Sequence, residues 1–467
     1  MESETRWQWR ERLRQYMHNV PPVRLIVISF VVLIVVGGLL LTTPLCSREH
    51  VPTNPVDAFF TSCSAVCVTG LVPFDTYLHW NTLGQVVILV LIQVGGLGLV
   101  TLTTGVTLLL RKKMGLRNLK LATENTNGDA ANMNELLRLI LLFTFTCEFV
   151  GAVLLMIRFV PLYSGQGVWI SVFLAVSAYC NAGFDILGFL KPCGNLIPFA
   201  EDPLVCLTIA GLIIIGGIGF IVISDIYRAK LHTQAHRQKR MPLSFHSRIV
   251  LLVTGLLLLV GTVLILLLEY NNVTLAGKSF GSKVLISFFQ SVSARTAGFA
   301  SVDIATELDF TKIVTILLMF IGASPGGTGG GIKTTTLLVL ICTVRAVLHG
   351  DEEATFAHRR FEKFTVYRAL AIAAMALLLV MVAGGAISVL EPQASTVDVF
   401  FEVTSAFGTV GTSANLTPTL SAPSKIILIF LMFAGRVGPV SLGMAVSLKH
   451  RHDSGACVLP EGKIVVG

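Results

Sequence analysis

Four glycines recur along this chain at nearly constant intervals and divide it into four similar parts. The intervals are 113, 115 and 113 residues, and a phenylalanine lies ten residues before each glycine. A period of this length, kept over the whole chain, indicates four copies of one structural unit. The glycines are Gly70, Gly183, Gly298 and Gly411, and the phenylalanines are Phe60, Phe173, Phe288 and Phe401.

Long apolar stretches place this repeat in a membrane. Hydrophobic residues make up 53% of the 467 residues and charged residues only 13%, against about 25% charged residues in soluble domains. Stretches of roughly 20 apolar residues are long enough to cross a bilayer. We expect eight spanning helices, at 25–42, 84–110, 136–160, 204–227, 247–269, 311–348, 367–390 and 425–448. Between the members of each pair lies a shorter segment suited to a re-entrant helix, near 55–67, 168–180, 280–294 and 396–408.

The distribution of basic residues predicts the topology. Five basic clusters alternate with pairs of apolar segments, so all five can lie on one face of the membrane. The positive-inside rule makes that face cytoplasmic. The net charge of +8 therefore indicates no nucleic-acid partner, and we expect a multi-pass protein of the cell (inner) membrane with both termini in the cytoplasm. The clusters run from Arg6 to Arg24, Arg111 to Arg138, Arg228 to Arg248, Arg345 to Arg368, and Lys449 to Lys463.

These patterns predict an all-α integral membrane fold. Four tandem helix–pore helix–helix repeats, with eight transmembrane helices and four re-entrant pore loops, would surround a central pore. The repeats are expected at 23–115, 130–232, 245–350 and 364–449, between cytoplasmic tails at 1–22 and 450–467. External loops with ordinary glycine turns are the alternative for any single repeat, and four repeats in register argue against it.

The glycines suggest what such a pore conducts. Irregular backbone at membrane depth is tolerated where it lines a water-filled cavity. Backbone carbonyls that point inward replace the hydration shell of a potassium ion, and only glycine adopts the necessary backbone angles at little cost.

The residues around the four glycines resemble the degenerate selectivity filters of the Trk/Ktr/HKT superfamily of potassium transporters. The likeness covers about residues 20 to 450. Eight spans without an extra helix pair favour the Ktr branch, and Gly70, where sodium-transporting members carry serine, favours potassium. The resemblance implies potassium bound by the backbone of twelve filter residues. They are Val68, Thr69, Gly70, Asn181, Ala182, Gly183, Thr296, Ala297, Gly298, Thr409, Val410 and Gly411.

A glycine-rich run at 322–334 interrupts the sixth span. It is not a phosphate-binding loop, because Ile332 separates Gly331 from Lys333. The resemblance implies an intramembrane loop that obstructs the pore until it moves, together with an arginine in the eighth span. A packing kink and a snorkelling arginine are the alternatives. The expected gate residues are Gly326, Gly327, Thr328, Gly329, Gly330, Lys333 and Arg436.

Three aspartates follow the filter glycines closely. Asp75, Asp185 and Asp303 would gather cations at the outer mouth, although solvated surface acids are an equal alternative.

The resemblance also implies partners. Two membrane subunits would form a homodimer, and a cytosolic ring of regulatory subunits would bind a nucleotide, ATP/ADP or NAD. The mixed-charge segment 351–363 is a candidate docking surface for that ring. Sodium coupling stays open, as does the alternative of a Trk-type potassium/proton or sodium-permeable cation transporter. We expect no enzyme, because paired carboxylates, a His-Glu-x-x-His motif and a nucleophile with its base are all missing from the sequence.

Overall fold

The computed structural model describes the backbone of residues 22–109, 133–235 and 243–439. Side chains are described for residues 24–98, 138–229 and 243–439. The two predicted tails, the end of the last predicted span and much of three predicted basic clusters lie outside these residues.

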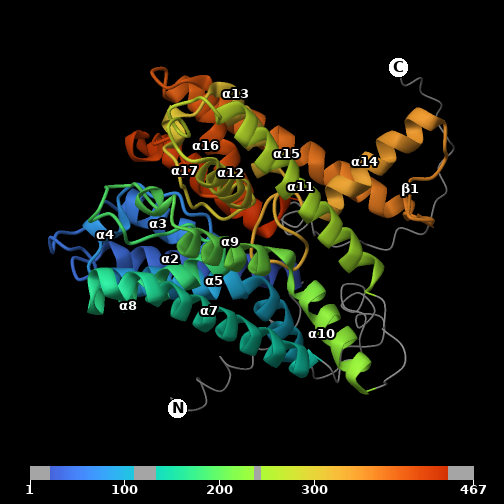
Figure 1. Cartoon of the computed structure of the whole chain (residues 1–467), viewed down its shortest axis with the longest axis horizontal. Helices are drawn as coiled ribbons and strands as arrows, with labels where there is room; N and C mark the ends of the chain where they lie inside the picture. The colour runs from blue at the N-terminus through green and yellow to red at the C-terminus, as the bar shows by residue number, and fades with distance from the viewer. Residues whose placement is uncertain (1–21, 110–132, 236–242, 440–467) are drawn as a thin grey trace, which may run out of the picture.

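The described chain is almost entirely helical (Figure 1). In each quarter of it a long helix is followed by a shorter one, and then by a further helix. The elements are α2 (Pro22–Thr42), α3 (Pro55–Cys67), α4 (Thr76–His79), α5 (Thr82–Leu109), α7 (Met133–Tyr163), α8 (Gly165–Tyr179), η2 (Ile197–Phe199), α9 (Pro203–Ile218), α10 (Phe220–Ala235), α11 (Phe245–Glu269), α12 (Phe280–Ser293), η3 (Ile304–Thr306), α13 (Asp309–Phe320), α14 (Thr334–His349), β1 (Thr355–Phe356), β2 (Arg359–Arg360), α15 (Lys363–Leu390), α16 (Thr396–Gly408), η4 (Thr417–Thr419) and α17 (Ala422–Val437).

Several helices are suited to a bilayer. Within the described residues four helices, α2, α7, α11 and α15, are long and apolar enough to cross one alone, and α9 with α10 is a fifth if the bent pair is one span. On α7, Leu142, Phe145 and Phe149 are more than half exposed at helical spacing, which makes an apolar stripe for lipid. The protein is membrane-embedded.

Two of the expected spans are broken helices. Instead of one helix over 204–227, α9 ends at Ile218 and α10 begins at Phe220, bent by 91°. Gly219 between them has φ +97°, and a Cβ there would lie 2.5 Å from the Pro325 carbonyl. The segment 311–348 is likewise divided into α13 and α14 by residues 321–333, one residue earlier at each end than the expected 322–334. We call residues 321–333 the intramembrane loop.

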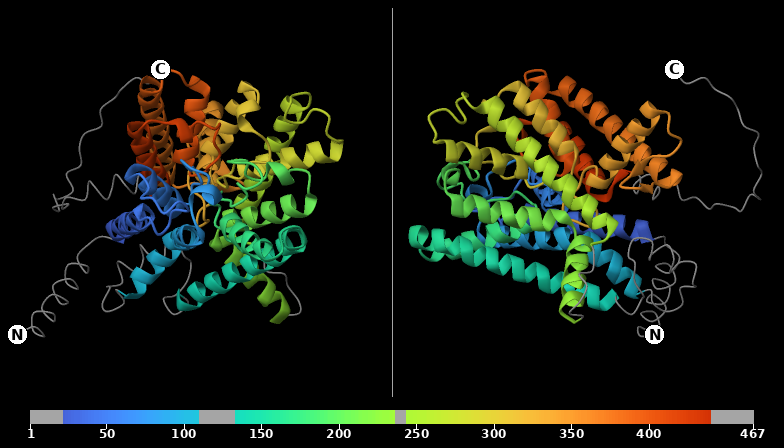
Figure 2. Two further views of the ribbon diagram at one scale, coloured as in Figure 1. Left: turned by 90° about the vertical axis from the view of Figure 1, so that its left-hand side faces the viewer. Right: turned by 45° about the vertical axis from the view of Figure 1, so that its right-hand side comes forward.

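Each short helix packs against a helix of the preceding quarter of the chain, and the first packs against a helix of the last quarter. α5 contacts α8, α9 contacts α12, α13 contacts α16, and α17 contacts α3. The last of these contacts joins the end of the described chain to its beginning. The arrangement is therefore a closed ring, with the first half of the chain and the second half on opposite sides (Figures 1 and 2).

Three of these helix contacts include a polar bond from the fourth residue of α17, α13 or α5. Lys425 of α17 pairs with Asp57 of α3, and Lys312 of α13 pairs with Asp398 of α16, each at 2.7 Å. In α5 the corresponding residue is Gln85, which accepts a bond of 2.8 Å from the Trp169 indole of α8. Buried pairs of this kind fix how two elements sit together, because an unpaired buried charge is costly.

The expectation of a wholly α-helical fold is corrected at one place. β1 and β2 form a small antiparallel hairpin after α14. The Phe361 N–H donates to the Ala354 carbonyl at 2.9 Å, and the Arg359 guanidinium lies 5.0 Å from the Phe245 ring centre. Positive φ angles at Ala357 and His358 produce the tight turn that such a hairpin requires.

Candidate functional site

The four glycines lie in short non-helical strips that share one backbone pattern. In each strip the residue two before the glycine and the glycine itself have positive φ, and the residue between them does not. Such alternation turns successive carbonyls to one side of the chain, which neither a helix nor a strand does. The pairs with positive φ are Val68 and Gly70, Asn181 and Gly183, Thr296 and Gly298, and Thr409 and Gly411.

Each strip is fixed by the C-terminal end of its own short helix. The Thr69 N–H donates to the Ser64 carbonyl at 2.8 Å, and Ala182 and Val410 bond equivalent serines at 2.7 and 2.8 Å. A left-handed residue after the last helical turn is a common helix C-cap, and these bonds satisfy carbonyls at the helix end. In the first and fourth strips, Ser64 and Ser405 also accept the glycine N–H at 3.0 Å.

The third strip differs by one residue. Its serine, Ser293, lies five residues before Gly298, whereas the other three strips have theirs six residues before the glycine. The Ala297 N–H therefore donates to a carbonyl four residues back, at 3.0 Å. The Ser293 hydroxyl donates to the carbonyl of Phe299, as Ser177 does to Phe184 in the second strip.

The four strips meet in a ring. A Cβ at Gly70 would lie 2.5 Å from the Ala182 carbonyl, and a Cβ at Gly183 would lie 2.7 Å from the Gly298 Cα. A Cβ at Gly298 would lie 2.5 Å from the Val410 carbonyl, and one at Gly411 would lie 2.8 Å from the Gly70 Cα. Each glycine thus contacts the next strip and the fourth contacts the first, so backbone alone surrounds the centre.

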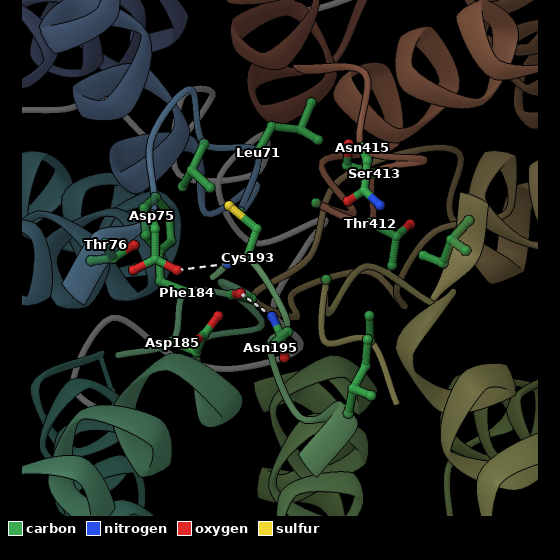
Figure 3. Close-up of a pocket in the computed structure, with 18 of the residues that line it drawn as sticks. Leu71, Asp75, Thr76, Phe184, Asp185, Cys193, Asn195, Thr412, Ser413 and Asn415 are labelled. Atoms are coloured by element: carbon green, nitrogen blue, oxygen red, sulfur yellow. Dashed lines mark hydrogen bonds between the residues drawn. The ribbon is translucent and has the colours of Figure 1, made fainter. Parts of the chain in front are cut away.

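A cavity of about 290 Å³ lies on one side of this ring and is lined by all four glycines. The three aspartates proposed from the sequence also line it, and Figure 3 shows two of them, Asp75 and Asp185. Their carboxylates have structural bonds as well: Asp75 caps α4, Asp185 accepts the Leu187 N–H at 2.9 Å, and Asp303 caps η3. Each aspartate therefore lines the cavity and also fixes the backbone of its own segment.

The intramembrane loop lies against the strips. The Gly330 N–H donates to the Thr409 hydroxyl at 3.0 Å, and Gly329 touches the Thr296 hydroxyl. The Thr328 hydroxyl donates to the Tyr179 carbonyl of α8 at 3.5 Å. Glycine is required at 329 and 330 because a Cβ there would collide with these threonines.

The body of the loop is held by other helices. Its ends pair with each other, since the Gly322 N–H donates to the Ile332 carbonyl at 2.8 Å. Ser324 and Thr328 donate their N–H groups to Gly217 and Gly216 at the end of α9, at 3.1 and 3.2 Å.

Two cations expected at the gate bond the loop. The Arg436 guanidinium of α17 is buried; it donates to the Thr328 carbonyl and to the Gly95 carbonyl of α5, the latter at 2.6 Å. It therefore joins α17, α5 and the loop. The Lys333 ammonium donates to the Gly329 carbonyl within the loop at 2.7 Å.

Two residues at this site were not singled out in the sequence. Glu402 of α16 is buried and accepts bonds from Ala414, Leu416 and Thr417, which hold the segment after the fourth strip. Asn195 donates to the Gly183 carbonyl at 3.3 Å. Glu402 adjoins the repeated Phe401, which could have drawn attention to it, whereas nothing local marks Asn195.

A membrane-embedded helical protein with a ring of backbone strips at its centre has the architecture of a transport protein and not of an enzyme. Residues 5–456 match the family model described as "Cation transport protein", and the chain belongs to that family.

Individual relatives agree with this assignment. The chain is 38% identical to the potassium/sodium uptake protein NtpJ of Enterococcus hirae, over 98% of this chain and 99% of that protein. It is 35% identical to the Ktr system potassium uptake protein B of Bacillus subtilis, with the same coverage. Among solved structures, the potassium transporter TrkH of Vibrio parahaemolyticus superposes with a TM-score of 0.67 at 18% identity, covering 91% of this chain and 84% of that one, which shows a shared fold.

Proposed function

We propose that this protein is the membrane subunit of a potassium uptake system and conducts potassium through the ring of four strips. One observation carries the proposal: four strips with the same alternating backbone pack glycine against glycine below a cavity. Carbonyl oxygens so arranged replace the water around a potassium ion. The names of the two relatives above, each at least 35% identical, support potassium as the cargo.

The proposed architecture is four parallel repeats, at 23–115, 130–232, 245–350 and 364–449, with eight crossings. The cyclic contacts of the short helices support it. Both termini then face the cytoplasm, and the three aspartates of the cavity face outward. There their charge raises the local cation concentration.

The intramembrane loop is the proposed gate. It touches the third and fourth strips and is held by bonds to α8, α9 and α17. Most of its partners belong to other parts of the ring, so a shift of those helices would release it. A cytosolic regulatory ring that binds a nucleotide would supply such a shift, and the exposed hairpin of β1 and β2 is its proposed contact. We also propose a homodimer in which each subunit has its own pore, because four strips already close one ring.

Sodium permeation or sodium coupling is a second candidate. It rests on the printed name of NtpJ, a potassium/sodium uptake protein. Glycine at position 70 favours potassium, since a side chain there would intrude on the second strip.

Growth rescue tests the proposed function. Cells without their own potassium uptake would express this chain with a candidate regulatory subunit, and rubidium and sodium influx would be measured at low external potassium. We expect rubidium influx that Gly70→Asp abolishes, because the carboxylate side chain would occupy the centre of the ring. Absence of influx despite membrane expression would contradict potassium transport, and influx unaffected by Gly70→Asp would contradict the location of the pathway.

A further inference from the structure

The loop at 188–196, between the second strip and α9, crosses the outer cavity. We call it the outer loop. Its Cys193 N–H donates to the Asp75 carboxylate at 2.8 Å, and the Leu196 N–H donates to the Ala300 carbonyl at 3.1 Å. Asp75 follows the first strip and Ala300 follows the third. The outer loop is therefore anchored to the segments on both sides of the second strip.

These anchors bring the Asn195 side chain onto the second strip (Figure 3). Its Nδ2 donates to the Gly183 carbonyl at 3.3 Å. The amide oxygen is buried and has no donor in the described structure. The reverse orientation of the amide would place two acceptor oxygens together, so the N–H group must face Gly183. Asn195 has φ +47°, a conformation that asparagine tolerates better than most residues.

This bond distinguishes the second strip from the others. In the part of the chain that the structure describes, the carbonyls of Gly70, Gly298 and Gly411 accept no side-chain hydrogen bond, whereas that of Gly183 does. A peptide group after glycine reorients easily, because glycine adopts positive and negative φ about equally well. A hydrogen bond to the carbonyl opposes that rotation.

We propose that Asn195 is a positioning residue for ion selectivity. It holds the Gly183 carbonyl in one direction and makes it the fixed oxygen of the outermost carbonyl ring. This inference rests on the proposed function, because a carbonyl direction matters to transport only if the strips coordinate the ion. Selectivity depends on the number and arrangement of coordinating carbonyls, so a carbonyl free to turn away would favour potassium less.

The chain offers a matched pair of variants. Asn195→Gly removes the side chain without strain, because glycine accepts positive φ. Asn415 also lines the cavity and has φ +63°, but its Nδ2 donates to the Asp303 carboxylate at 3.1 Å. Asn415→Gly thus makes the same change in the same cavity without touching a strip carbonyl.

The experiment measures the ratio of rubidium to sodium influx in cells that express the full chain with its regulatory partner. We expect Asn195→Gly to lower the ratio about fivefold, the change that corresponds to one hydrogen bond, and Asn415→Gly to leave the ratio unchanged. An unchanged ratio in Asn195→Gly, or equal falls in both variants, would overturn the assignment, because a merely structural role alters the amount of protein and not the ratio.

A second variant covers the case in which Asn195→Gly does not reach the membrane. Asn195→Asp keeps the size and the backbone tolerance but replaces the donor with acceptors, and we expect the ratio to fall at least as far. A ratio equal to that of the unsubstituted protein would again overturn the inference. Failure of the proposed function is distinguishable, since the unsubstituted protein would then show no rubidium influx.

Discussion

The four strips and the intramembrane loop are both non-helical backbone within a helical protein, but they are held differently. Each strip is bonded mainly to the end of its own short helix, as Thr69 is to Ser64 five residues away. The loop is bonded to elements far along the chain, for example through Arg436, 108 residues from Thr328.

This difference distinguishes the strips, which we expect to stay fixed, from the intramembrane loop, which we expect to move. Bonds within a few residues do not depend on how neighbouring repeats sit, so we expect each strip to stay attached to its own short helix if the ring moves. Bonds between repeats depend on how the helices sit together, so we expect the loop, the proposed gate, to move when those helices move. A pore needs both, since selectivity depends on fixed oxygens and gating on an element with two arrangements.

Shortening the loop should have the largest effect. Deletion of Gly326 to Gly331 removes the contacts with Thr296 and Thr409, and we expect rubidium influx without the regulatory partner to rise at least about tenfold. The more conservative Arg436→Gln should act in the same direction, because a bond to a charged group contributes about 1.5–3 kcal/mol.

Lys333→Gln should raise influx less than Arg436→Gln, since within the described residues the Lys333 ammonium bonds only the loop itself. The measurement is rubidium influx into vesicles that contain each variant without the regulatory partner. A deletion variant that folds and reaches the membrane but shows unchanged rubidium influx would contradict the proposal that the loop is the part that moves.

We expect the pH dependence of stability to show an effect smaller than that of shortening the loop and larger than that of changing a strip. Burial raises the pKa of Glu307, in the segment after the third strip, to about 8. The folded protein then binds a proton at Glu307 more tightly than the unfolded chain does. The stability gained from this proton is complete below about pH 4.5 and is lost as the pH rises towards about 8. The Gln290 amide donates to Glu307 at 3.2 Å, and Glu307→Gln keeps an uncharged acceptor for this hydrogen bond.

We expect the detergent-solubilised protein to lose thermal stability between pH 5 and pH 8.5, and Glu307→Gln to lose less. Glu201→Gln serves as the control. Lys278 lowers the pKa of the exposed Glu201 carboxylate. The contribution of ionised Glu201 to stability is therefore lost only as the pH falls below the usual range of a glutamate. Equal losses in the unsubstituted protein and Glu307→Gln would contradict a protonated Glu307.

The smallest effect should come from the strip itself. Ser405→Ala removes the acceptor of the Gly411 N–H, and we expect the ratio of rubidium to sodium influx to fall by about two- to fivefold with gating unaltered. Ser388→Ala removes a hydroxyl that has no hydrogen-bond partner among the described residues and should change neither property. If Ser405→Ala altered gating instead of selectivity, the distinction between the two regions would be lost.

Much of the helical framework could be anticipated because its signals are local. The short segments expected at 55–67 and 396–408 coincide with α3 and α16. In α3 the capping Asn54, Pro55 and the apolar spacing lie within a few residues of one another. The break at Gly219 was missed, because the chain packs against Gly219 at the Pro325 carbonyl, a contact between segments far apart in the sequence that leaves no local signal. The serine of the third repeat lies one residue nearer its glycine in the sequence, but only the hydrogen bonds of Ser293 show what this shift does to the strip.

The sequence by itself determined which residues form the strips, since positive φ at the glycines and helix ends before them are properties of neighbouring residues. Only the tertiary structure decided which residues meet across the ring. Asp57 and Lys425, 368 residues apart, pair because α17 closes against α3. Asn195 reaches Gly183 because the outer loop is anchored to the segments that follow the first and third strips. Such contacts depend on the closure of the whole ring, and no local pattern encodes that closure.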